Sequence, residues 1–321
     1  MIKKILYIFI LLFTSITYSQ LSKTHYIPPL THAAEGNANA VDQWIYISTP
    51  STSPVNVSIL PVGGTAQTIT VQNDQPQKVQ VSTNGYSQLY VEANTTSQVM
   101  NNKGYIIDAD KPIYVSVRVN AGGVEGSDDS SAQAGALVTK GLDGLGRIFR
   151  VGTFNSQSNS ANFNNYLNFL SVMATEDNTT VNFTNNYTSG FVIENYSGQF
   201  PVNNIQLNRG ESYVIALELK DTSTATTQDA VTRNRDGLIG TLIQSDKDIV
   251  VNSGSSNGSF HNGGARDYGI DQIVDLSRVG KEYILVRGDG SDGWENILVV
   301  GHEDGTEINI YGSSNSTQTI N

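Results

Sequence analysis

One serine of the sequence lies in a pattern that hydrolases use. Ser256 stands at the centre of residues 254–258, Gly-Ser-Ser-Asn-Gly, which match the Gly-x-Ser-x-Gly turn of serine nucleophiles, and His261 follows closely. That turn requires a strand before the serine and a helix after it. The residues that follow Ser256 are rich in Gly, Ser and Asn, which form helices poorly. The pattern therefore favours a Gly/Ser loop over a catalytic serine.

Two acidic clusters have side chains of the kind that bind calcium, which prefers oxygen ligands. Neither cluster has the spacing of a complete calcium-binding loop, so we expect solvated turns. The weak calcium candidates are Asp128, Asp129, Asp289 and Asp292, with Glu125 and Glu295 beside them. No other cofactor is expected.

The other candidate groups are scattered. The histidines form no closely spaced ligand pair, so metal catalysis is not predicted; they are His25, His32, His261 and His302. The tripeptide 287–289, Arg-Gly-Asp, spells an integrin-recognition motif but also fits a strand that ends in a turn. Trp44, Trp294 and Tyr187 could stack on sugars, although both tryptophans stand at strand starts where core packing is an equal alternative.

The N-terminus predicts export. Lys3 and Lys4 precede an apolar run over residues 5–16, and the small residues Thr17 and Ser19 follow, as in a signal peptide of residues 1–19. The run is too short for a membrane-spanning helix. The chain has no cysteine, which removes thiol catalysis and, in an exported protein of this size, suggests a bacterium. A formal charge of −11 disfavours nucleic acid as a partner.

Strand patterns run along the whole chain. Ile113, Val115, Val117 and Val119 alternate with polar residues, which indicates a strand with one buried face. The dipeptide 84–85, Asn-Gly, predicts a tight hairpin between the strands near residues 79–81 and 89–91. The sequence therefore predicts an all-β protein.

Internal repeats indicate how these strands are organised. Residues 168–183 match residues 295–310 without a gap, so that Asp177 corresponds to Asp304, and residues 44–57 form a weaker copy. The runs 110–115 and 246–251 share Asp-Lys-x-Ile, and residues 146–151 match 280–285, with residues 25–27 as a degenerate copy. Each repeat of roughly 130 residues reads as a sandwich-like β unit.

We expect a first unit over 20–137, a second over 138–270 and the start of a third over 271–321. The third holds only the opening strands of the repeat. Either these strands complete the preceding unit, or the chain is the front of a longer protein, which is the expected case. Tandem β-sandwich-like repeats are favoured, and a propeller-like closed arrangement is the alternative.

The runs 146–151, 173–181 and 246–251 resemble the IgGFc-binding protein N-terminal domain family, across residues 40–315. The residues after the predicted signal, 21–30, are similar to the start of large surface proteins that gliding bacteria export by the type IX system. The resemblance implies an extracellular adhesion or interaction module, and no individual binding residue is carried over from it. A fold likeness does not by itself carry a ligand over.

We therefore expect a secreted or cell-surface, non-enzymatic module that binds a protein or a glycan. A structural spacer in a large secreted protein is the alternative, and a glycan hydrolase, which needs two facing carboxylates, is the less favoured one.

Overall fold

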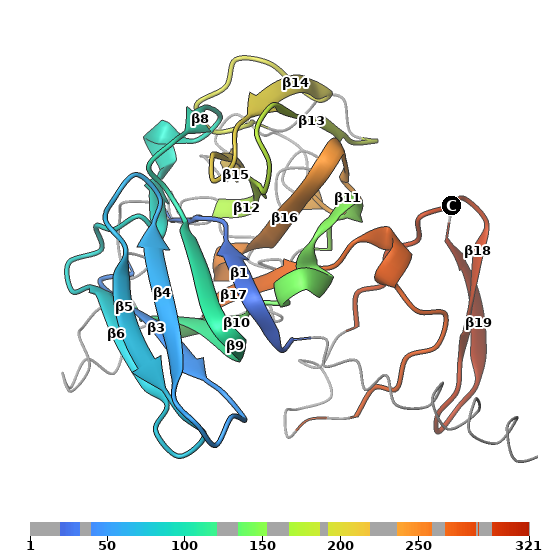
Figure 1. Ribbon diagram of the computed structural model, residues 1–321. Helices are drawn as coiled ribbons and strands as arrows, with labels where there is room; N and C mark the ends of the chain where they lie inside the picture. Colours follow the sequence, from blue (N-terminus) through green and yellow to red (C-terminus); the bar gives the residue numbers. More distant parts are fainter. Residues whose placement is uncertain are drawn as a thin grey trace, which may run out of the picture.

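The computed structural model describes residues 20–32, 40–120, 134–152, 167–186, 192–218, 236–258, 267–286, 288 and 297–320. This part of the chain is built from strands and three short 3-10 helices (Figure 1), with no α-helical element. The short helices are η2 (Ala93–Thr95), η3 (Gly141–Gly144) and η4 (Leu276–Arg278). The strands form two large sheets and two small two-stranded ones.

The first sheet has the order β5-β4-β9-β3-β6, and β1 and β10 also pair with β9. Its strands are β1 (Ser22–Ile27), β3 (Asp42–Ser48), β4 (Val55–Pro61), β5 (Gln67–Val71), β6 (Gln77–Ser82), β9 (Tyr105–Asn120) and β10 (Ala134–Val138). The long strand β9 organises the sheet. Its first half pairs with β1 and β4, and its second half pairs with β3 and β10.

The second sheet has the order β14-β13-β16-β12-β15-β8, and β11 and β17 also pair with β16. Its strands are β8 (Val99–Met100), β11 (Gly146–Arg150), β12 (Leu167–Ala174), β13 (Thr179–Thr184), β14 (Val202–Leu207), β15 (Ser212–Glu218), β16 (Leu242–Gly258) and β17 (Asp267–Ile273). Here β16 has the role of β9. Its first half pairs with β11 and β13, and its second half pairs with β12 and β17.

The two long strands have equivalent neighbours. The pairing of β1 with β9 shifts register between Ser22 and Thr24, and that of β11 with β16 shifts between Gly146 and Ile148. The shift lies at the same point of the matched sequence, because Ser22 pairs with Ile113 and Gly146 pairs with Ile249, the two isoleucines of the Asp-Lys-x-Ile runs. Similar local sequence thus gives similar pairing.

Alternation along the strands separates a core face from an outer face. Ile113, Val115, Val117 and Val119 are buried in the core of the first sheet, as the sequence predicts. The second sheet has its own core, to which Phe149 and Phe183 contribute. The architecture is all-β and sandwich-like, as expected.

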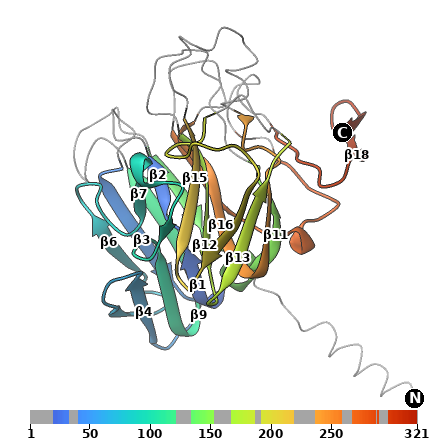
Figure 2. The ribbon, with the colours of Figure 1, turned by 90° about the horizontal axis from the view of Figure 1, so that it is seen from above.

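The two sheets also pack on each other (Figure 2). A short parallel pair joins β2 (Leu30–His32) and β7 (Tyr90–Glu92), and β2 lies against β12, β15 and β16 of the second sheet. Phe169, Val214 and Ala216 of the second sheet join the core cluster of the first. The face of the second sheet that points away from its own core is therefore covered by the first sheet.

One expected hairpin does not form. Gly85 has the positive φ of 86° that the Asn-Gly dipeptide predicts, but β6 pairs with β3, and β7 pairs in parallel with β2. The Asn84 side chain forms a local turn, in which its oxygen accepts a hydrogen bond from the backbone N–H of Tyr86 at 3.1 Å. The strand after this turn pairs with β2 and not with β6, so the turn does not close a hairpin.

The acidic turns of the repeat have the expected backbone. Asn178 has a φ of 54° and Gly305 a φ of 77°, conformations that Asn and Gly tolerate. The second of these turns leads into β18 (Thr306–Ile310), which pairs with β19 (Ser316–Ile320). This hairpin stands apart from the two large sheets (Figure 1).

Candidate functional site

The outer face of β3 and β9 carries aromatic and basic side chains. Ile45 and Ile47 of β3 point into the core, so the residues between and before them point outward. Trp44 and Tyr46 are accordingly half-buried and lie outside the core clusters. Of the two alternatives for Trp44, the structure supports the outward position.

Cations lie over both rings. Lys78 Nζ of β6 is 4.4 Å from the centroid of the Trp44 ring, and the Arg118 guanidinium of β9 is 4.5 Å from that of Tyr46. The two rings are themselves 6.4 Å apart. Trp44 pairs with Gln80 and Arg118, and Tyr46 pairs with Lys78, so each cation reaches its ring diagonally across the sheet. Each contact contributes about 0.5–1 kcal/mol at an exposed site.

This arrangement decides what the surface presents. The cations cover ring faces that a sugar would need for stacking. The same contacts hold the ammonium of Lys78 and the guanidinium of Arg118 over the outer face of the sheet. Tyr114 is 36% exposed on the same face of β9. We call the residues Trp44, Tyr46, Lys78, Tyr114 and Arg118 the aromatic-cation face.

The second sheet has a face equivalent to the aromatic-cation face, and the strand pairing identifies the matching residues. Ile47 lies opposite Val115, and Val172 lies opposite Val251. Val115 and Val251 each follow the isoleucine of an Asp-Lys-x-Ile run by two residues. Ile47 and Val172 are therefore equivalent positions. Trp44 lies three residues before Ile47 in β3, and Phe169 lies three residues before Val172 in β12, so these two residues are equivalent as well.

Phe169 is fully buried in the core cluster of the first sheet, whereas Trp44 remains half-exposed. The same face of the repeat is thus covered by another part of the protein in the second sheet and open to a partner in the first.

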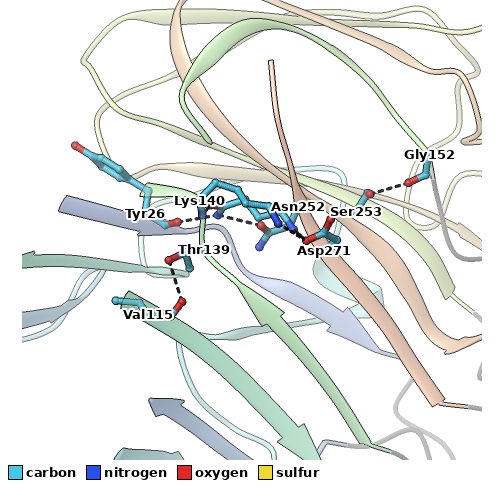
Figure 3. A network of polar contacts seen from close by, with 9 residues as sticks. Tyr26, Val115, Thr139, Lys140, Gly152, Asn252, Ser253 and Asp271 are labelled. Atoms are coloured by element: carbon cyan, nitrogen blue, oxygen red, sulfur yellow. Dashed lines mark hydrogen bonds and ion pairs between the residues drawn. The ribbon is translucent and has the colours of Figure 1, made fainter. Parts of the chain in front are cut away.

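A buried polar network joins the two sheets (Figure 3). Asn252 of β16 donates from Nδ2 to the carbonyl oxygen of Pro28 at 2.9 Å. Gln272 of β17 donates from Nε2 to the carbonyl oxygen of Tyr26 at 3.0 Å and accepts from the N–H of Lys140 at 2.7 Å. Lys140 Nζ also pairs with Asp271 at 3.2 Å. Because these bonds link β1 to β16 and β17, they fix the orientation of the aromatic-cation face relative to the second sheet.

His25 is buried beside this network. Its Nδ1 lies 2.6 Å from Thr139 Oγ1, and its Nε2 lies 3.0 Å from the carbonyl oxygen of Ile113. Burial lowers the pKa of His25, against the opposing effect of the carbonyl oxygens of Ile113 and Ser22. The neutral ring, with Nε2 as the donor, fits this site. His25 is therefore part of the packing and not a metal ligand.

The candidate nucleophile is not held in an elbow. Ser256 is buried within β16, which continues to Gly258, so the chain remains extended after the serine. His261 lies outside the described residues. The expected loop is also not what forms at Ser256, because Ser255 and Gly258 on either side of it pair with β17, with a register shift between them.

The calcium candidates Asp128, Asp129, Asp289 and Asp292, with Glu125 and Glu295, all lie outside the described residues. So do Arg287, Trp294 and Tyr187. Within the described ranges, no three His, Asp or Glu side chains are grouped so that they could hold a metal ion. His302 accepts a hydrogen bond at Nδ1 from Arg150 at 3.1 Å.

Sequence reasoning noted Trp44 but missed the face around it. The signal was present in the alternation of β9, where Tyr114 and Arg118 fall on the side opposite the valines. The contribution of Lys78 depends on the pairing of β6 with β3, which no local pattern specifies.

Fold and surface together define an all-β, sandwich-like protein with one open aromatic-cation face. The chain belongs to the family described as IgGFc binding protein, whose model matches residues 134–321, more than half of the chain. The match begins at β10 and is narrower than the expected span of 40–315. Among curated proteins no sequence matches the chain. In the described part of the chain, no helix is long and apolar enough to span a membrane.

Proposed function

We propose that this protein is an extracellular interaction module that binds a protein partner through the aromatic-cation face. The observation that carries the proposal is the contrast between Trp44 and Phe169. The equivalent face of the second sheet is buried against polypeptide, so this surface of the repeat is suited to protein contacts. Family membership supports a binding role.

The composition of the aromatic-cation face also supports a protein partner. Trp, Tyr and Arg are the residues that contribute most to binding at protein interfaces. A protein partner is favoured over a glycan because Lys78 and Arg118 cover ring faces on which sugars would stack. In a chain with 30 acidic and 19 basic residues, the guanidinium of Arg118 on this face favours an acidic patch on the partner.

The export, cellular location and unit organisation of the protein are part of the same proposal. Residues 1–19 act as an export signal, and the protein reaches the surface or the medium of a gliding bacterium through the type IX system. The unit boundaries proposed from sequence, 20–137, 138–270 and 271–321, describe its organisation. The shared pairing of β9 and β16 supports a second candidate function, a spacer that repeats one unit, in which case the open face binds nothing.

Binding to an immunoglobulin Fc fragment, the ligand in the family description, tests the proposal. Surface plasmon resonance would compare the wild type with the double variant Trp44→Ala/Arg118→Ala. Tyr311→Ala is the matched control, since Tyr311 is an aromatic residue that is 80% exposed outside the face. We expect the double variant to bind roughly 30-fold more weakly, as for an interface hot spot, and the control to bind like the wild type.

Equal affinity of the double variant and the wild type would contradict the assignment of the face. Failure of the wild type to bind Fc, together with binding to a glycan array, would contradict a protein partner. No binding in either assay would favour the spacer.

A further inference from the structure

The end of β1 is where the second sheet attaches to the first. Tyr26 lies in one buried cluster with Met173 of β12. The carbonyl oxygens of Tyr26 and Pro28 accept side-chain hydrogen bonds from β17 and β16 at 3.0 and 2.9 Å. Residues 26–28 therefore form a short segment that holds the outer face of the second sheet.

The end of β11 is the equivalent segment of the second sheet. Tyr26 pairs with Ile106, which lies seven residues before the isoleucine of the Asp-Lys-x-Ile run in β9. Arg150 pairs with Leu242, which lies seven residues before the isoleucine of the same run in β16. Arg150 is therefore the counterpart of Tyr26, and residues 150–152 are the counterpart of the segment that holds the second sheet.

A further copy of the β12 sequence lies against this second segment. Residues 298–302 belong to the copy that matches β12, and Val300 in it corresponds to Met173. A Cβ added at Gly152 would lie 3.8 Å from Val300 Cγ2 and 3.9 Å from Leu298 Cδ2, which is ordinary van der Waals contact. The same part of the repeat thus meets the same strand end twice in one chain.

Arg150 fixes this contact with hydrogen bonds. Its Nε donates to His302 Nδ1 at 3.1 Å, and its Nη2 donates to the carbonyl oxygen of His302 at 3.3 Å. Its Nη1 donates to the carbonyl oxygen of Gly240 at 2.8 Å, before the start of β16. Ser253 Oγ donates to the carbonyl oxygen of Gly152 at 3.1 Å and holds the other end of the segment (Figure 3). The guanidinium therefore bridges the second sheet and residues 298–302.

We propose that residues 150–152 are a joining site, which takes the outer face of the following β unit as residues 26–28 take the outer face of the second sheet. The occupant is the segment 298–302 of this chain. Consecutive units are then held in a fixed relative orientation by one repeated contact, and the aromatic-cation face has a fixed position relative to residues 298–302. This positioning function does not rest on the binding of a ligand.

The two contacts differ in what stabilises them. Tyr26 is buried with apolar partners, whereas its counterpart Arg150 makes polar contacts, and Leu298 beside the second segment is 50% exposed. The orientation of residues 298–302 should therefore depend on the hydrogen bonds of Arg150, which acts as a positioning residue.

Distances between spin labels on the full-length protein test the joining site. The chain has no cysteine, so labels can be attached at introduced cysteines, and Thr68, Asn203 and Val299 are exposed positions for them. Double electron–electron resonance would measure the pair Asn203→Cys and Val299→Cys across the joining site. The pair Thr68→Cys and Asn203→Cys spans the contact between the two large sheets. Each pair should give one narrow distance distribution.

Replacing Arg150 by alanine removes the bridge. Arg150→Ala should widen the distribution between positions 203 and 299 roughly twofold, because this contact opens locally, and should leave that between positions 68 and 203 unchanged. Arg147→Ala is the matched control, since Arg147 lies on the same strand and its salt bridge to Asp248 stays within the second sheet. The control should give the wild-type distribution.

A second pair of variants tests the apolar side of the contact. Gly152→Phe would place a ring where Leu298 and Val300 lie and should widen the same distribution, whereas Gly152→Ala adds only ordinary contacts and should not. A broad distribution between positions 203 and 299 in the wild-type background would overturn the proposal. So would a distribution as narrow in Arg150→Ala as in its control, or as narrow in Gly152→Phe as in Gly152→Ala. Failure of Fc binding would leave these results unchanged.

Discussion

Replacing Gln272 by alanine tests the network that joins the two sheets. Gln272 is 1% exposed, and its side chain bridges the N–H of Lys140 and the carbonyl oxygen of Tyr26. Alanine removes both bonds and also the 3.3 Å bond to Asn252 Oδ1.

The expected loss follows from the groups that remain. Each buried backbone group that loses its partner costs about 1–3 kcal/mol. Two such groups give about 2–6 kcal/mol, and water that enters the space left by the side chain reduces this figure. We therefore expect Gln272→Ala to lower the free energy of unfolding by about 3 kcal/mol, which for a chain of this size lowers Tm by roughly 6–10 °C.

Chemical and thermal denaturation followed by circular dichroism would measure this loss. Gln77→Ala, at an exposed position of β6, is the matched control and should change the stability by less than about 0.5 kcal/mol. Because the cores share buried residues, the wild type should unfold in one transition. A loss in Gln272→Ala as small as that of the control would refute the view that this network holds the sheets together.

Four further substitutions have defined outcomes. Gly104→Ala should cost more than 2 kcal/mol, since its Cβ would lie 2.1 Å from Met173 Cε, whereas Gly305→Ala, with open space around it, should cost about 1 kcal/mol in the same denaturation assay.

Burial lowers the pKa of His25 below its ordinary value of 6.5. The contribution of the neutral ring to the free energy of unfolding is therefore complete above pH 6.5 and falls as the pH drops below it. The variant His25→Gln should lose this pH dependence when unfolding is measured from about pH 7.5 to 5. Burial raises the pKa of Asp275, but hydrogen bonds from Ser277 and from backbone N–H groups outweigh it. The lowered pKa makes stability fall as the pH drops through and below 3.8, and Asp275→Asn should flatten this acid limb in the same titration.

Much of the fold was predictable because the alternation of apolar and polar residues and the internal repeats are visible in short stretches of sequence. The valines of β9 show their buried face directly. The match between residues 168–183 and 295–310 locates β12, β13 and β18 without any knowledge of tertiary structure. Repeats carry this information because a similar sequence forms similar local pairs.

What could not be predicted depends on contacts between distant strands. The Asn84-Gly85 turn is read correctly as a positive-φ turn, but the partner of the strand after it is β2, which is chosen by packing against the second sheet. Likewise, β9 continues through Pro112, where local sequence suggests an end. Pairing on both sides of β9 explains why the strand persists.

The candidate site could likewise be predicted only in part. The outward position of Trp44 follows from its place beside Ile45, but its role depends on whether another part of the chain covers it. Phe169 occupies the equivalent place and is buried, and only the packing of the two sheets distinguishes the two residues.

A hydrogen-exchange footprint of the Fc complex tests the central claim most directly. If the aromatic-cation face is the binding surface, exchange on Fc binding should slow in β3, β6 and β9 and stay unchanged in β13 and β14 of the second sheet. Protection confined to the second sheet or to the β18-β19 hairpin would contradict the claim.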